Sequence, residues 1–164
     1  MHMQAPRASR PITVLLVDDD PDCRMLIRDV ITAAASRAEV CEAADGRQAL
    51  DFLRRLGAFA RSPRPDLIYL DVEMPALSGR EVLKAIRSDP ALRDIPVVML
   101  TGLDDEEEKQ EALRNGAAGY VVKPAEPRRF LAVVTRSVNH WMRRQRGAAG
   151  RVLCPADRED VGDD

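Results

Sequence analysis

The chain has no hydrophobic run approaching the roughly 18–20 residues that a membrane-spanning helix needs, and no apolar signal-peptide region is visible at its N-terminus. It also lacks an excess of one charge, because 25 basic residues stand against 27 acidic ones and the net charge is -2. A general nucleic-acid binder would carry a basic excess. We therefore expect a cytoplasmic protein with no membrane partner and no DNA partner.

The sequence contains only three cysteines, an odd number. Cys23, Cys41 and Cys154 have no metal-ligand spacing, so we predict reduced thiols rather than a disulfide framework or a zinc site. The remaining composition is that of an ordinary globular protein, with 45% apolar and 32% charged residues in 164. A chain of this length is typical of one domain that folds without disulfide or metal staples.

Short apolar runs alternate with amphipathic segments along the whole chain. Strands are predicted at 12–17, 39–42, 67–70, 95–100 and 120–122, and a segment with helical spacing of apolar residues follows each of them. Apart from 39–42, which begins and ends with glutamate, the runs are mostly apolar without alternation, which indicates strands buried on both faces. The predicted fold class is therefore α/β, with a five-stranded parallel sheet and five helices.

The ends of the chain differ from its middle. The folded domain is predicted over residues 11–142, with a flexible N-terminus at 1–10 and a disordered tail at 143–164 that is basic first and acidic at its end. The connection at 57–65 is longer than a typical loop of an α/β fold.

Polar side chains stand where the predicted strands end, and open parallel sheets bind ligands at that edge. Asp18 and Asp19 follow the first strand, Asp71 the third, Thr101 the fourth and Lys123 the fifth. Two carboxylates about 4 Å apart repel by roughly 4 kcal/mol at an effective dielectric of about 20, so the cluster predicts a cation, Mg²⁺ or Mn²⁺. Lys123 and Thr101 suit an incoming phosphoryl group. One carboxylate is then left as its nucleophilic acceptor.

Four motifs resemble those of receiver domains in two-component response regulators, over residues 11–142. They are VLLVDDDP at 14–21, DLIYLDVEMPALSG at 66–79, PVVMLTG at 96–102 and AAGYVVKP at 117–124. The resemblance implies the flavodoxin-like, doubly wound receiver fold with strand order 2-1-3-4-5. It also implies that Asp71 is the phosphoacceptor, supplied by a histidine kinase or a small phosphodonor. A non-enzymatic signalling protein is expected, which assists its own phosphorylation and dephosphorylation.

The same resemblance assigns roles to the surrounding residues. Asp19 and Asp71 would bind the metal directly, Asp18 through water and Glu73 through its backbone carbonyl. Thr101 and Lys123 would contact the phosphoryl oxygens, and the Lys123–Pro124 peptide is expected to be cis. On phosphorylation Thr101 would move toward the new oxygens and Tyr120 would follow inward, which would reshape the surface of the fourth helix, fifth strand and fifth helix.

A narrower resemblance concerns the partner. The long connection at 57–65, with Arg64-Pro65-Asp66, Arg80-Glu81-Val82-Leu83 and Ser88-Asp89-Pro90, is similar to regulators paired with bacterial phytochrome histidine kinases. The alternative is a tolerated surface insertion. We predict a homodimer through the region of the fourth helix, fifth strand and fifth helix, and a downstream protein that the sequence does not name.

Three alternatives to a stand-alone regulator stay open at this point. One is an intermediate in a phosphorelay. Another is a Mg²⁺-dependent phosphatase or phosphotransferase with an aspartate nucleophile, although no insertion is long enough for a cap over the substrate. The last is a DNA-binding regulator, supported only by the basic stretch Arg143-Arg144-Gln145-Arg146.

Overall fold

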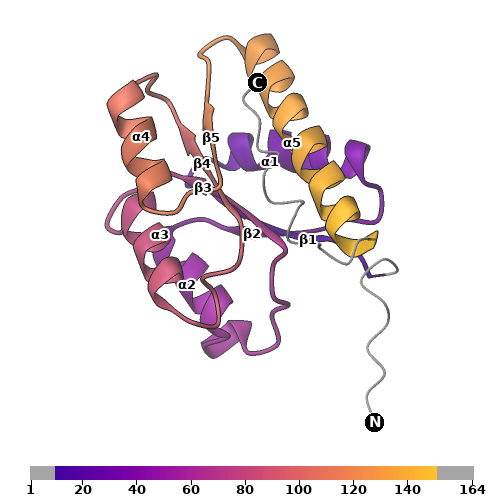
Figure 1. Ribbon diagram of the computed structural model, residues 1–164, viewed down its shortest axis with the longest axis vertical. Helices are drawn as coiled ribbons and strands as arrows, with labels where there is room; N and C mark the ends of the chain where they lie inside the picture. The colour runs from indigo at the N-terminus through magenta and orange to yellow at the C-terminus, as the bar shows by residue number, and fades with distance from the viewer. Residues whose placement is uncertain (1–9, 151–164) are drawn as a thin grey trace, which may run out of the picture.

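The computed structural model describes residues 10–150, and their strands and helices alternate along the chain (Figure 1). The strands are β1 (Thr13–Val17), β2 (Glu39–Ala43), β3 (Leu67–Asp71), β4 (Val97–Thr101) and β5 (Gly119–Val122). The helices are α1 (Pro21–Ala34), α2 (Gly46–Arg54), the short 3-10 helix η2 (Gly57–Phe59), α3 (Gly79–Ser88), α4 (Glu106–Arg114) and α5 (Pro127–Gly150).

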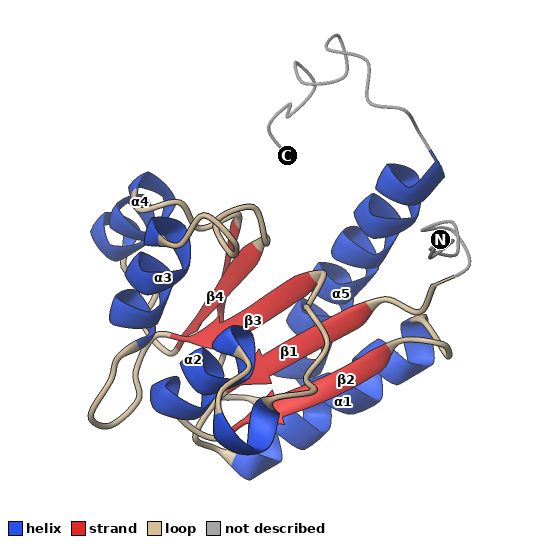
Figure 2. Cartoon of the chain, turned by 90° about the horizontal axis from the view of Figure 1, so that it is seen from below, coloured by secondary structure: helices blue, strands red, loops and turns tan. Residues whose placement is uncertain are grey.

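The five strands form one parallel sheet in the order β2-β1-β3-β4-β5, which confirms the predicted fold. Helices α1 and α5 cover one face of the sheet, and α2, α3 and α4 cover the other (Figure 2). Every residue of the central strands β1, β3 and β4 is buried. Their continuous apolar sequence therefore has the expected cause, since both faces of these strands are covered.

Side-chain caps set the starts of the helices. Asp20 accepts a hydrogen bond from the Asp22 backbone N–H at 2.9 Å, directly before Pro21 at the first position of α1. Ser78 and Glu81 form a capping box at the start of α3, with reciprocal hydrogen bonds of 3.3 and 2.9 Å. Short loops thus lead from the strand ends into the helices, and these loops carry the polar residues of the sheet edge.

Helix α5 continues beyond the predicted domain boundary. It reaches Gly150, whereas the sequence places the start of a disordered tail at residue 143. A contact on this last part accounts for the difference: Gln145, which comes shortly after the fully buried Met142 of the predicted domain, donates from its side-chain amide to the Asp66 carbonyl at 2.9 Å. Most of the N-terminus predicted to be flexible (1–9), the last part of the predicted tail (151–164) and Cys154 lie outside the described residues, while Cys23 and Cys41 are free thiols. No helix between residues 10 and 150 has the length and apolar character to cross a membrane.

Candidate functional site

The predicted strand-end residues meet at one edge of the sheet. Asp18 follows β1, Asp71 and Thr101 close β3 and β4, and Lys123 follows β5. All of them are buried or half-buried, whereas Asp19 is exposed. A carboxylate oxygen from each of the three aspartates lies within 4.8 Å of the others. The parallel topology therefore brings together side chains that are far apart in the sequence.

Asp18 and Lys123 form a buried ion pair. The Lys123 Nζ donates to Asp18 Oδ2 at 2.7 Å, and the Asp20 backbone N–H donates to Asp18 Oδ1 at 2.9 Å. Burial alone would raise the pKa of Asp18, but hydrogen bonds from Cys23, Lys123 and the Asp20 N–H lower it below its ordinary value. Asp18 is thus a carboxylate with hydrogen bonds to both oxygens.

Lys123 is held in the charged form by the same pair. Burial alone would lower the pKa of its ammonium, yet the hydrogen bond and the charge of Asp18 raise it above the ordinary value. The Lys123 backbone N–H donates to the Thr101 carbonyl at 2.6 Å, so the ladder between β4 and β5 fixes the point from which the side chain extends. The ammonium also lies 3.6 Å from Asp71 Oδ1.

Asp71 is the carboxyl group of the site that can still accept further bonds. Its Oδ1 accepts a 3.3 Å hydrogen bond from the Glu73 backbone N–H, and within residues 10–150 Oδ2 receives none. Burial raises the pKa of Asp71 to about 7, Lys123 opposes the shift, and the negative charges of Asp18 and Asp19 add to it. This side chain therefore combines a partly unengaged carboxyl group with a nearby cation.

The donor set fits a divalent cation. Three carboxylates share a small volume, and the negative charges of Asp18 and Asp19 add to the effect of burial, which is the main cause of the raised pKa of Asp71. A hard cation such as Mg²⁺ or Mn²⁺ takes oxygen ligands of this kind and would relieve the repulsion. Asp19 is exposed, and Asp71 Oδ2 accepts no hydrogen bond from the described part of the chain, so these two could bind the ion directly. Asp18, with both oxygens hydrogen-bonded, suits a contact through water.

Thr101 and Tyr120 connect the site to the α4 side of the sheet. Thr101 is fully buried, and its Oγ1 accepts from the Leu103 N–H at 3.1 Å. Tyr120 is half-buried with its hydroxyl already turned inward. Burial raises the pKa of Tyr120, and a weak interaction with Thr101 opposes the shift. That contact falls short of a well-formed hydrogen bond, so the hydroxyl has no such partner in the described part of the chain.

A match to a protein family identifies the family to which this site belongs. Residues 14–135 match the model of the response regulator receiver domain. The chain belongs to this family. Like the observed strand order, this match confirms the resemblance drawn from the four motifs.

Known receiver proteins resemble this chain in both sequence and structure. The chain is 32% identical over 132 residues to "Response regulator Rcp1" of Synechocystis, covering 80% of this chain and 90% of Rcp1. The crystal structure of the phosphorylated cyanobacterial phytochrome response regulator RcpA superimposes with a TM-score of 0.76 at 32% identity, covering 80% of this chain and 94% of that one. The Mn²⁺-bound form of Rcp1 gives 0.76 at 30% identity, covering 88% and 99%.

One expectation for the receiver site was wrong. The Lys123–Pro124 peptide is trans, not cis. The trans isomer of an X–Pro bond is the more stable by about 0.5–1 kcal/mol. Lys123 is already positioned by its backbone hydrogen bond to Thr101 and its side-chain bond to Asp18, so the ammonium reaches the site with the ordinary isomer.

Three supporting residues of the receiver site are not among the residues predicted from the sequence. Arg24 donates from its guanidinium to the Asp18 carbonyl at 2.5 Å and holds the β1–α1 turn. Gly79 lies against the backbone of Asp71, where an added Cβ would stand 2.1 Å from the Asp71 carbonyl oxygen. Glu108 is a buried carboxylate of α4 that pairs with an arginine of α3. The glycine of the Ser78-Gly79 pair was a visible signal, but the other two contacts depend on tertiary structure.

Proposed function

We propose that this receiver accepts a phosphoryl group on Asp71 from the phosphohistidine of a histidine kinase. The observation that carries the proposal is the placement of Asp71, which is buried at the sheet edge with the Lys123 ammonium 3.6 Å from Oδ1 and, among residues 10–150, no hydrogen bond to Oδ2. A carboxylate oxygen attacks phosphorus, the P–N bond breaks, and the imidazole leaves with a proton. The product is an aspartyl phosphate.

The neighbouring residues have separate roles in this step. Lys123 balances the charge of the phosphoryl oxygens, and the Thr101 hydroxyl donates a hydrogen bond to one of them. Asp19 and Asp71 would hold Mg²⁺ or Mn²⁺ directly, with Glu73 contributing through its carbonyl and Asp18 through water. When bound, the ion supplies positive charge that offsets the negative charge of the transferring group.

We favour a regulator that is itself phosphorylated over a phosphatase that hydrolyses many substrate molecules. Hydrolysis of a phosphate ester with an aspartate nucleophile calls for a second acid beside that nucleophile. Of the acids close to Asp71, Asp18 is an ionised carboxylate paired with Lys123, and Asp19 is assigned to the metal. Glu73 stands two residues after Asp71, but its side chain is exposed and its backbone N–H makes the contact with Asp71. The site therefore supports one phosphoryl transfer to the protein rather than repeated cleavage of small esters.

The output surface that we propose consists of α4, β5 and α5. A hollow of about 810 Å³ lies along the edge strand β5 and α5, and Tyr120, Arg136 and Trp141 help to line it. Tyr120 faces both this hollow and the inside of the molecule. A shift of Thr101 toward a phosphoryl group on Asp71 would change the space available to Tyr120 and, with it, the shape of this surface.

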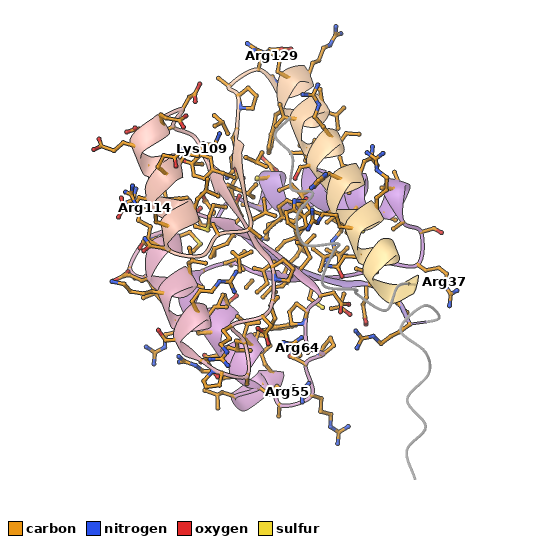
Figure 3. All side chains as sticks on the ribbon, viewed as in Figure 1. Arg37, Arg55, Arg64, Lys109, Arg114 and Arg129 are labelled. Carbon is orange, nitrogen blue, oxygen red and sulfur yellow. The ribbon has the colours of Figure 1, made fainter. Side chains whose placement is uncertain are left out.

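The charges on this surface suit a second copy of the receiver. The start of α4 is acidic, with the exposed residues Asp104, Asp105, Glu106 and Glu107. Helix α5 is basic, with the exposed residues Arg128, Arg129, Arg136, Arg143 and Arg144, and Arg129 lies in its first turn (Figure 3). We propose a homodimer in which the acidic end of one copy faces the basic helix of the other. A monomer by light scattering, with and without beryllofluoride, would contradict it.

The kinase that we propose is a cytoplasmic histidine kinase of the phytochrome type. Support comes from the similarity to RcpA, a phytochrome response regulator. A phosphotransfer profile against histidine kinases of the same source tests this pairing. Onward transfer from Asp71 to a second histidine-containing protein would instead make the receiver an intermediate in a phosphorelay.

Intact mass spectrometry after incubation with acetyl phosphate and Mg²⁺ tests the phosphoacceptor itself. The wild-type protein should gain the mass of one phosphoryl group, and Asp71→Asn should gain none. Asp51→Asn, which changes an aspartate of α2 away from the sheet edge, is the matched control and should behave as wild type. Failure of the wild type to gain mass, or equal gain by Asp71→Asn, would refute the assignment.

A further inference from the structure

An ion pair joins α3 to α4 on the inner side of the output surface. Arg80, in the first turn of α3, donates to Oε1 of Glu108, in the first turn of α4. The Glu108 side chain is only 8% exposed, whereas Arg80 is 52% exposed. A buried carboxylate without its cation is strongly unfavourable. The position of α4 in this structure therefore depends on an arginine that belongs to a different helix.

Arg80 is also tied to the backbone of Asp71 through its neighbour. The Gly79 N–H donates to the Val72 carbonyl at 3.0 Å. A Cβ at Gly79 would stand 2.1 Å from the Asp71 carbonyl oxygen, so the start of α3 is packed directly on the strand end that carries Asp71. A displacement of the Asp71 backbone would therefore move Gly79, and Arg80 is the next residue in the chain.

The same ion pair closes the space around Tyr120. A small cavity, about 10 Å³ in volume, is lined by Arg80, Glu108, Tyr120, Met99 and Leu83. Its size leaves room for no more than one water molecule. The buried Tyr120 hydroxyl has no well-formed hydrogen bond within the described chain, so the ion pair closes a space that contains an unsatisfied polar group. Movement of α4 would open this space.

We infer that Arg80 and Glu108 form an interhelical latch that fixes α4 and couples its position to Asp71 through Gly79, separately from Thr101. The coupling to phosphorylation rests on the proposed function, whereas the latch itself does not. Arg80 and Glu108 are positioning residues, because neither contacts the carboxyl group of Asp71. The latch adds a second connection between the sheet edge and the output surface, on the α3 side of Tyr120.

Hydrogen exchange measured by mass spectrometry on the full chain, without any phosphodonor, tests the latch. In Arg80→Met and Glu108→Gln, amides of 106–114 should exchange about tenfold faster than in the wild type, while those of β1 should not change. Arg80→Lys, which retains the charge, should stay close to wild type. Arg28→Met removes a more exposed interelement pair, Arg28–Glu42 between α1 and β2, 2.6 Å long, and should leave 106–114 unchanged.

A second measurement addresses the coupling. Beryllofluoride with Mg²⁺, a mimic of the phosphoryl group, should change the exchange of 106–114 in the wild type and should do so several-fold less in Arg80→Met. Unchanged exchange of α4 in Arg80→Met without beryllofluoride, or equal acceleration in α4 and β1, would overturn the latch. If the wild type takes no phosphoryl group from acetyl phosphate, the proposed function fails, and the comparison without beryllofluoride still decides the latch.

Discussion

The Lys123 ammonium lies 2.7 Å from Oδ2 of Asp18, and this contact joins the residue after β1 to the residue after β5 at the sheet edge. The same nitrogen is 3.6 Å from Asp71 Oδ1. One cation thus stabilises two buried carboxylates, fully at Asp18 and in part at Asp71. Burial raises the pKa of both groups, but at Asp18 hydrogen bonds from Cys23, Lys123 and the Asp20 N–H outweigh it and lower the pKa, whereas at Asp71 burial prevails and raises the pKa to about 7.

Removal of the ammonium should destabilise the fold. Lys123→Met leaves the Asp18 carboxylate buried without a counter-charge, and we expect a loss of roughly 3–5 kcal/mol in the free energy of unfolding at pH 7. The double variant Asp18→Asn/Lys123→Met should recover much of this loss, because the unpaired charge is then absent. Urea denaturation of the two single variants and the double variant measures the coupling. Strictly additive losses would show that the two side chains do not interact.

Asp71→Asn should stabilise the metal-free protein at alkaline pH. The folded-state pKa of about 7 is above the unfolded value, so the fold favours the protonated carboxyl group and loses stability as the pH rises from about 4 through 7. The amide cannot ionise, and we expect a gain of roughly 1–3 kcal/mol at pH 8 that vanishes below about pH 4. Denaturation in EDTA at both pH values checks this. A variant less stable than wild type at pH 8 would contradict it.

Metal binding should depend on Asp19 and Asp71 and on pH. Mg²⁺ should raise the Tm of the wild type at pH 8, and Asp19→Asn and Asp71→Asn should lose most of that increase because each removes a ligand. Binding should weaken as the pH falls through 7, since protons compete for Asp71. Asp51→Asn serves as the matched control. An equal increase in Tm for all of these proteins would place the ion elsewhere.

Gly79→Ala should be far more costly than Gly102→Ala. The new Cβ at position 79 would lie 2.1 Å from the Asp71 carbonyl oxygen, whereas nothing is within 4 Å of a Cβ at position 102. Relief of this overlap requires backbone movement, so we expect a loss of about 1–3 kcal/mol for Gly79→Ala and little change for Gly102→Ala. Thermal unfolding of both variants provides the comparison. Equal stability would mean that the α3 start can shift freely from Asp71.

The sequence predicts those features that depend on local pattern. Continuous apolar runs place the strands, and the parallel sheet then brings Asp71 and Lys123 to one edge. Contacts without a local signal escape prediction. In the sequence Glu108 is one of several acids at the start of a helix, yet in the structure Arg80 of α3 pairs with it. Leu56 has helical spacing with Phe52 but is 51% exposed, because α2 ends at Arg54.

The position of the phosphoryl group after reaction with acetyl phosphate and Mg²⁺ tests the central claim most directly. Borohydride reduces an aspartyl phosphate to homoserine, and peptide mass spectrometry then identifies the reduced residue. The account predicts homoserine at position 71 in the wild type and none in Asp71→Asn. Homoserine at Asp18 or Asp19, or no reduced residue in the wild type, would contradict it.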